Sequence, residues 1–315
     1  MKALITGVTG QSGSHLAEQL RNDGHQVWAL DHGQANPKKP WIESLIPTIR
    51  WVSGDLLDQP SLQRALEQSR PDIVYNLAAI TFVGMSWDQP NLVSEVTGLG
   101  VLRMLEAIRQ VDPGIRFVQA SSSEMFGSNP PPQSETTRFH PRSPYGVAKL
   151  FAHFTTVNYR ESHGIFASTA IMFNHESPRR GPEFVSRKIT TAAARISRGL
   201  CNELRLGNTN AYRDWGYAPD YMNAVQMIGN HVEPDDFVVA TGDSRQVKEL
   251  CDVAFREVGL DYRDHLVIDP QFYRPADVEY LQGDASKIRE VLGWRPTVPF
   301  EEMVARMVKH ELAQL

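Results

Sequence analysis

The chain has 315 residues, 41% of them hydrophobic, and a formal net charge of -5 at pH 7. This length exceeds one typical domain, and the weakly acidic balance excludes a strong attraction for nucleic acid or anionic membranes. Small molecules are therefore the expected partners. The only two cysteines, Cys201 and Cys251, are far apart, which excludes a disulfide framework and a zinc site, so no metal is expected.

The first residues run directly into a glycine loop, which leaves no room for a signal peptide. Nor is any apolar run long enough to cross a membrane. We therefore expect a cytoplasmic protein.

Short apolar segments alternate with segments of helical spacing along the first part of the chain. Strands are expected at residues 3–5, 26–30, 72–77, 116–119, 166–172 and 237–240. Helices are expected at residues 14–22, 61–68, 93–110 and 145–161. This alternation predicts an α/β fold with a doubly wound, Rossmann-type parallel sheet.

The alternation ends after Asn174, where segments rich in Arg, Gly and Pro begin. They indicate a smaller C-terminal α+β substrate lobe, and apolar residues at helical spacing between Phe300 and Leu312 predict an amphipathic helix that packs on it. We place a dinucleotide-binding domain at 1–173, with a returning strand near 237–242. Residues 174–315 form mainly the substrate-binding lobe, interleaved with the first domain.

A Gly-x-x-Gly-x-x-Gly loop follows the first strand and opens a helix. The residues expected to hold the dinucleotide there are Gly7, Thr9, Gly10, Gln11, Ser12 and Gly13. Glycines allow a tight turn and close approach of a pyrophosphate, whose charge then lies at a helix N-terminus. The next two strand ends add Asp55, Leu56, Leu77, Ala78 and Ala79.

Asp31 ends the second strand, where a carboxylate accepts hydrogen bonds from both ribose hydroxyls and repels a 2′-phosphate. This residue favours NAD. Lys38 and Lys39 follow in the next loop and are able to neutralise such a phosphate, so NAD and NADP both remain open, with NAD slightly ahead.

Tyr145 and Lys149 form a Tyr-x-x-x-Lys motif, whose spacing places both side chains on one helical face. Tyrosine, with a pKa of about 10, is a poor base at neutral pH, but a nearby ammonium and a positively charged nicotinamide favour its phenolate. Upstream, the run from Ser121 to Glu124 places hydroxyls and one carboxylate near the same cofactor face. Glu124 is informative, because a carboxylate there can remove the proton alpha to a new ketone, as elimination requires.

Six segments closely resemble the GDP-mannose 4,6-dehydratase family, and together they span almost the whole chain. They are residues 123–127, 141–149, 173–181, 213–216, 274–279 and 283–287. The resemblance implies a hydro-lyase that converts GDP-mannose to GDP-4-keto-6-deoxymannose. In that reaction a tightly bound NAD or NADP takes hydride from C4 and returns it to C6, with loss of water and no net redox change.

The resemblance also implies roles for individual residues. Tyr145 would deprotonate the 4-hydroxyl, supported by Lys149 and with Ser122 bonded to the same oxygen, and Glu124 would take the C5 proton and expel the C6 hydroxyl. Further cofactor contacts are implied for Thr81, His175 and Arg180. Substrate contacts are implied for Ser123, Glu124, Asn174, Lys188, Arg213, Arg274 and Glu279, with Asp277 as the alternative to Glu279. Arg179 and Arg187 are interpreted as solvated surface charges.

Two stretches depart from the family pattern. Members commonly carry Arg-Arg-Ser-Ser after the second strand, where this chain has residues 31–36 and a shorter connection onward, which puts NADP binding and a tetramer in question. The family's Ser-His near the nicotinamide is Thr81-Phe82 here, a change that suits a related sugar such as a GDP-heptose. Fold analogy predicts a homodimer through the helices at 93–110 and 145–161.

Two other functions remain as alternatives. One is a reductase or epimerase acting on a GDP-4-keto sugar with the same tyrosine and lysine. The other is a catalytically silent dinucleotide sensor or scaffold, against which the intact Ser122, Glu124, Tyr145 and Lys149 argue.

Overall fold

The computed structural model describes residues 1–33, 36–273 and 276–315. In these residues a seven-stranded parallel sheet has the order β3-β2-β1-β4-β5-β6-β10. Its strands are β1 (Lys2–Thr6), β2 (Gln26–Asp31), β3 (Arg50–Ser53), β4 (Ile73–Asn76), β5 (Arg116–Ser122), β6 (Ala167–Met172) and β10 (Asp236–Val239). The strand order reverses between β1 and β4, which in open α/β sheets is where ligands bind. The predicted Rossmann-type fold is confirmed.

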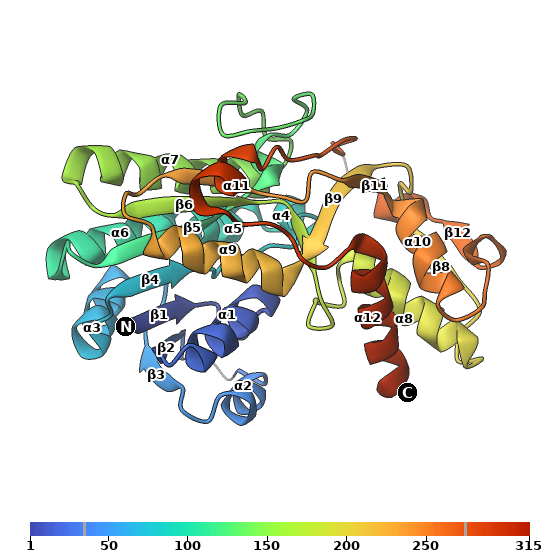
Figure 1. Ribbon diagram of the computed structural model, residues 1–315, viewed down its shortest axis with the longest axis horizontal. Coiled ribbons are helices and arrows are strands. Elements are labelled where there is room, and N and C mark those ends of the chain that lie inside the picture. Colours follow the sequence, from blue (N-terminus) through green and yellow to red (C-terminus); the bar gives the residue numbers. More distant parts are fainter. Residues whose placement is uncertain (34–35, 274–275) are drawn as a thin grey trace.

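Helices cover both faces of this sheet (Figure 1). One face carries α3 (Gln59–Ser69), α6 (Gly100–Val111) and α7 (Pro144–His163), and the other carries α1 (Gln11–Asn22) and α9 (Ala218–Asn230). Successive strand residues point to opposite faces, so Leu4 enters the core under α3 and α6, while Ala3 and Ile5 enter the core under α1. Three shorter helices complete this part: α2 (Lys39–Leu45), α4 (Met85–Asp88) and α5 (Pro90–Val93).

The smaller lobe lies beside the sheet, around its own apolar core (Figure 1). Its strands are β7 (Asn174–Glu176), β9 (Tyr212–Tyr217) and β11 (Ser244–Gln246) in one sheet, and β8 (Leu204–Leu206) with β12 (Leu266–Ile268) in another. Its helices are α8 (Val185–Ser197), α10 (Val247–Arg256) and α12 (Phe300–Ala313). The predicted amphipathic helix is α12, which buries Met303, Val304 and Val308 in this core.

The chain returns to the larger sheet after β9, because α9 packs against α1, and β10 pairs with β6. Short α11 (Ser286–Leu292) then contacts β10. The exact division at residue 173 stays a prediction. No helix of the described residues has the length and apolar character needed to cross a membrane.

One predicted helix is interrupted. Residues 93–110 were expected to form a single α-helix, but Ser94–Leu99 form a π-helix before α6 begins. This segment packs tightly on α7, where a side chain in place of Gly98 would lie 3.4 Å from the Ala148 carbonyl oxygen. A one-turn π-helix is a known way to shift a helical face within a continuous helix, and here the sequence period alone did not reveal it.

Candidate active site

A cleft of about 1120 Å³ opens at the carboxyl ends of the parallel strands, between the sheet and the smaller lobe. Most of the predicted site residues line it. They are Gly7, Thr9, Gly10, Gln11, Ser12, Gly13, Leu77, Ala78, Ala79, Thr81, Ser122, Ser123, Glu124, Tyr145, Lys149, Asn174, His175, Arg180, Lys188 and Arg213. The predicted Asp31, Asp55, Leu56 and Glu279 are not part of this lining, and Arg274 lies outside the described residues.

The glycine loop has the close packing that a pyrophosphate site needs. A side chain at Gly7, which has φ +70°, would lie 2.8 Å from the backbone of Ala78, and one at Gly13 would lie 2.2 Å from the Gly7 carbonyl oxygen. Helix α1 begins at Gln11 without a side-chain cap, so the amide groups of its first turn are free to bind an anion. These residues therefore fit a dinucleotide.

Asp31 lies at the end of β2, beside the cleft residues His32 and Lys38. Its Oδ2 accepts a hydrogen bond from Lys39 Nζ at 2.7 Å, while its buried Oδ1 has no partner among the described residues. A buried carboxylate oxygen without a donor is costly. Oδ1 is thus suited to a ribose hydroxyl, although Lys39 already neutralises part of the carboxylate charge.

Asp55 and Leu56 follow β3 and contact the protein itself. The Asp55 carboxylate accepts a hydrogen bond from the Leu57 amide at 2.9 Å, and the Asp55 amide donates to Ser61 Oγ at 2.9 Å. Leu56 is buried against the α3 and α6 core. Their predicted cofactor contact is therefore not visible in the cleft lining and stays a prediction.

The catalytic candidates come from β5 and α7. Ser143 caps α7 by accepting a hydrogen bond from the Gly146 amide at 3.0 Å, and the preceding strand β5 ends at Ser122. Tyr145 and Lys149 are both almost fully buried, at 6% and 3% exposure. Lys149 Nζ donates to the Ala120 carbonyl oxygen at 2.6 Å and lies 5.8 Å from the centre of the Tyr145 ring.

Burial dominates the electrostatics of this pair. It raises the pKa of Tyr145, an effect that the hydrogen bond to Ser122 and the positive charge of Arg180 oppose, and the charge of Glu124 reinforces. Burial also lowers the pKa of Lys149 to about 8. Arg180 is thus a cation that acts on the tyrosine, a role that the sequence analysis gave to the Lys149 ammonium and the nicotinamide.

The lobe side of the cleft is rich in paired cations. Arg213, on β9, is 8% exposed, and its Nη2 lies 3.3 Å from Asp277 Oδ1. Asp277 also accepts a hydrogen bond from Asn208 at 3.2 Å, and all three residues line the cleft. Glu279 is exposed and outside the lining, so Asp277 is the one of these two acidic residues that the structure brings to the cleft.

Arg180 is held by two neighbours within the lobe. Its Nε lies 3.0 Å from Glu176 Oε2, and its guanidinium carbon lies 3.5 Å from the centre of the Phe184 ring. Phe184 in turn packs edge-to-face on Phe82 at 6.0 Å. The substituted Phe82 therefore forms part of an aromatic wall beside Arg180, and sequence reasoning missed both Phe184 and Glu176.

The interpretation of Arg179 and Arg187 as solvated surface charges is wrong. Arg179 pairs with Glu18 at 2.8 Å and lines the cleft. Arg187 pairs with Glu311 of α12 and donates to the Pro178 carbonyl oxygen at 2.6 Å. Both side chains are only 20% exposed, because folding brings carboxylates from distant helices against them, which local sequence did not indicate.

Lys188 extends from α8 over the Phe272 ring, with Nζ 4.7 Å from the ring centre. Asn174 starts β7 and pairs with Trp215 of β9. Phe272, like Asn208, lines the cleft and was not predicted. Asn208 carried a usable signal, because it follows the short apolar strand β8 and the turn at Gly207.

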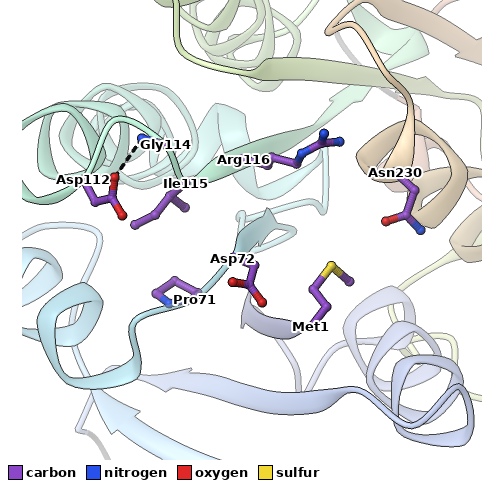
Figure 2. Close-up of a pocket in the computed structure, with 8 residues that line it drawn as sticks. All are labelled: Met1, Pro71, Asp72, Asp112, Gly114, Ile115, Arg116 and Asn230. Atoms are coloured by element: carbon purple, nitrogen blue, oxygen red, sulfur yellow. Dashed lines mark hydrogen bonds between the residues drawn. The ribbon is translucent and has the colours of Figure 1, made fainter.

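A second hollow of about 490 Å³ lies at the opposite, amino ends of the strands (Figure 2). Its polar side chains serve the fold. Asp72 accepts a hydrogen bond from the Lys2 amide at 2.6 Å, and Arg116 donates to the Gly229 and His231 carbonyl oxygens at 2.9 and 2.8 Å. We assign no function to this hollow.

Comparison with known proteins identifies the family. The family model described as GDP-mannose 4,6 dehydratase matches residues 4–307. The chain belongs to the GDP-mannose 4,6-dehydratase family. It is 49% identical to GDP-mannose 4,6 dehydratase 1 of Arabidopsis thaliana, with 98% of this chain and 89% of the relative covered. Identity to GDP-mannose 4,6 dehydratase of Homo sapiens is 39%, covering 97% of this chain and 90% of the relative.

Solved structures agree with this assignment at the level of fold. UDP-glucose 4-epimerase of Thermus thermophilus, solved in complex with NAD, superposes with a TM-score of 0.86 at 29% identity, covering 99% of each chain. The family model and the relatives confirm the family membership that the motifs predict.

Proposed function

We propose that this chain is a nicotinamide-dependent GDP-mannose 4,6-dehydratase, which converts GDP-mannose to GDP-4-keto-6-deoxymannose. One observation carries the proposal beyond a generic oxidoreductase. Glu124 lies in the same cleft as Ser122, Tyr145 and Lys149, which combines alcohol oxidation with the base that elimination needs. The relatives of this name, matched over nearly the whole chain, support it.

Each residue is assigned one step. Tyr145 takes the proton of the sugar 4-hydroxyl, Ser122 holds the same oxygen, and Lys149 supplies positive charge near the Tyr145 ring. Glu124 removes the C5 proton and returns it to the C6 hydroxyl, which leaves as water. The proton taken up by Tyr145 balances the one that C5 gains when C6 receives the hydride. The bound nicotinamide supplies the hydride acceptor, and later donor, that leaves the overall reaction without net oxidation.

On the lobe side, Arg213 and Lys188 are the proposed ligands of the GDP diphosphate. Guanidinium groups bind such oxygens in bidentate fashion. Arg274 stays a proposed diphosphate ligand from sequence alone.

The cofactor is NAD or NADP, held by the glycine loop and by residues 77–81. The neighbouring Thermus enzyme binds NAD. The unpartnered Oδ1 of Asp31 supports NAD, while Lys38 at the cleft and Lys39 on Oδ2 supply the charge that NADP needs. We propose NAD as the preferred form.

The direct test is to incubate the purified protein with GDP-mannose and to follow the nucleotide sugar by mass spectrometry. We expect a product lighter by one water, without net consumption of cofactor, and no such product from Glu124→Gln. Unchanged GDP-mannose in folded, cofactor-loaded protein would contradict the proposal.

Two alternatives share the site. A GDP-4-keto-sugar reductase or epimerase would tolerate Glu124→Gln and would consume reduced cofactor or invert a centre without loss of water. A GDP-heptose substrate is favoured by Phe82 in the cleft wall. Faster loss of water from a GDP-heptose than from GDP-mannose would move the assignment to that sugar.

A homodimer is proposed through α6 and α7. Helix α7 exposes Val147, Phe151 and Phe154, by 55%, 43% and 54%, and their spacing places them along one side of the helix. Light scattering should give twice the chain mass for the native protein and one chain mass for Phe154→Asp; equal masses would refute this interface.

We also propose that the protein works in the cytoplasm. Cys201 and Cys251 are free thiols, the state that a reducing compartment maintains. Fractionation of the source cells would test this location.

A further inference from the structure

The segment that enters the smaller lobe is joined to the first turn of α1. His175 Nε2 lies 2.8 Å from Ser12 Oγ, and His175 Nδ1 lies 2.9 Å from the Phe173 carbonyl oxygen. A carbonyl oxygen only accepts, so Nδ1 carries the proton and donates it. Nε2 is then the acceptor, and the Ser12 hydroxyl donates to it.

The imidazole is also fixed by its surroundings. Its face stacks on the buried ring of Tyr221, with ring centres 5.0 Å apart and planes at 25°. Burial, with Arg180 second, lowers the pKa of His175 to about 4. The ring is therefore neutral at physiological pH, and both nitrogens are already bonded to protein groups.

Three further hydrogen bonds involve the same two segments, the start of α1 and residues 175–177. Gln11 Nε2 donates to the His175 carbonyl oxygen at 2.9 Å, and Ser177 Oγ donates to Gln11 Oε1 at 2.9 Å. His15 Nε2 lies 3.0 Å from Ser177 Oγ, and because that hydroxyl has already given its hydrogen, His15 is the donor. The first two residues of α1 are thus connected to both ends of the segment from His175 to Ser177.

These hydrogen bonds connect two parts of the cleft lining. On one side, Gln11, Ser12 and Gly13 line the cleft in the first turn of α1, where helix amides have no intrahelical acceptor. On the other, Asn174 and Arg180 lie before and after residues 175–177 in the chain and line the same cleft. The Ser12 hydrogen points to His175, so backbone amides, not this hydroxyl, are left to bind a phosphate.

We propose that His175 is a positioning residue, which acts through Ser12 to hold the first turn of α1 and couples dinucleotide binding to the nucleotide-sugar side of the cleft. The inference rests on the proposed function, since it requires that the glycine loop binds a dinucleotide.

A set of matched variants tests it. His175→Phe keeps a ring to stack on Tyr221 but loses both nitrogens, His175→Gln keeps a hydrogen-bonding end, and Ser12→Ala removes the other partner. Protein freed of co-purified dinucleotide is titrated with NADH and NADPH, and GDP is titrated before and after cofactor loading. Thermal unfolding of each variant is recorded alongside.

Loss of one buried hydrogen bond corresponds to an affinity loss of roughly tenfold. We expect that loss of dinucleotide affinity in His175→Phe and in Ser12→Ala, no further loss in the double variant, and recovery in His175→Gln. Cofactor loading should strengthen GDP binding in the wild type and in His175→Gln, but not in His175→Phe.

Additive losses, reaching roughly a hundredfold in the double variant, would overturn the proposal, as would unchanged affinity in Ser12→Ala. If His175→Phe does not fold, Ser12→Ala carries the same test. Absence of dinucleotide or GDP binding in the wild type would instead refute the proposed function, so the two failures are distinguishable.

Discussion

The two walls of the cleft are built on different electrostatic principles. On the sheet side, Tyr145 and Lys149 are desolvated and bonded to neutral groups, the Ser122 hydroxyl and the Ala120 carbonyl oxygen. On the lobe side, Arg180 and Arg213 keep their charge beside carboxylates, at 3.0 and 3.3 Å.

The difference separates two tasks. Burial lowers the pKa of Lys149 to about 8, which suits a group that exchanges protons. It raises the pKa of Tyr145, which the hydrogen bond to Ser122 and the charge of Arg180 oppose. Ion pairing leaves an arginine charged and oriented, which suits groups that recognise a diphosphate. Changes on the sheet side should therefore lower kcat, and changes on the lobe side should raise KM.

The largest effect is expected on the sheet side. Tyr145→Phe removes the proton acceptor, and a positioned general base contributes about 10²–10⁴-fold, so kcat should fall by that factor with little change in KM. The matched control is Tyr159→Phe on the same helix, whose hydroxyl donates to Glu106 and does not line the cleft. Equal kcat losses in the two variants, measured by steady-state kinetics, would place the reaction elsewhere.

The next effect is expected on the lobe side. Arg213→Gln should raise KM for the nucleotide sugar by roughly 10–100-fold, the value of a charged hydrogen bond, while kcat changes much less. Arg245→Gln is the control. Arg245 of β11 lies opposite Arg213 of β9 in the strand register but is outside the cleft lining. A loss confined to kcat would show that Arg213 belongs to the reaction side.

The third effect concerns Asp31, at the end of β2. Asp31→Asn keeps the shape but weakens acceptance from a ribose hydroxyl, so affinity for NADH should fall by roughly tenfold and affinity for NADPH should fall less or rise. Fluorescence titration with both nucleotides measures this. A larger loss for NADPH than for NADH would mean that Asp31 and Lys39 serve the 2′-phosphate.

The smallest effect concerns stability in acid. Burial lowers the pKa of His15 from 6.5 to about 3 and that of His175 from 6.5 to about 4. Below pH 6.5 these histidines therefore bind protons in the unfolded chain but not in the folded chain. Their contribution to stability is fully present above pH 6.5 and is lost as pH falls toward the folded-state pKa values.

His15→Gln should reduce this acid sensitivity. Calorimetry at pH 7 and pH 5 should show a fall in Tm that is smaller by roughly 3 °C in His15→Gln than in the wild type. The exposed His163→Gln serves as the control. An identical fall in all three proteins would mean that His15 does not resist protonation in the fold.

Sequence reasoning succeeded where function needs local spacing. The glycine loop at Gly7 to Gly13, the pair Tyr145 and Lys149, and Glu124 are each recognisable within a few residues. All of them line the same cleft, because parallel strands bring their carboxyl ends to one edge.

Sequence reasoning failed where the ion-pair partner of a residue lies far away in the chain. The carboxylates that bury Arg179 and Arg187 are Glu18 and Glu311, and no local pattern connects them. Helix α9 was missed because it belongs to the sheet layer although the chain reaches it through the smaller lobe.

The most direct test of the account is the fate of the hydrogen at C4. GDP-mannose carrying deuterium at C4 is converted by the enzyme in ordinary water, and the product is examined by NMR and mass spectrometry. The account predicts a product that has lost one water and holds the deuterium at C6. A dehydrated product without deuterium, or deuterium released to the free cofactor pool, would contradict the internal hydride transfer on which the proposed function rests.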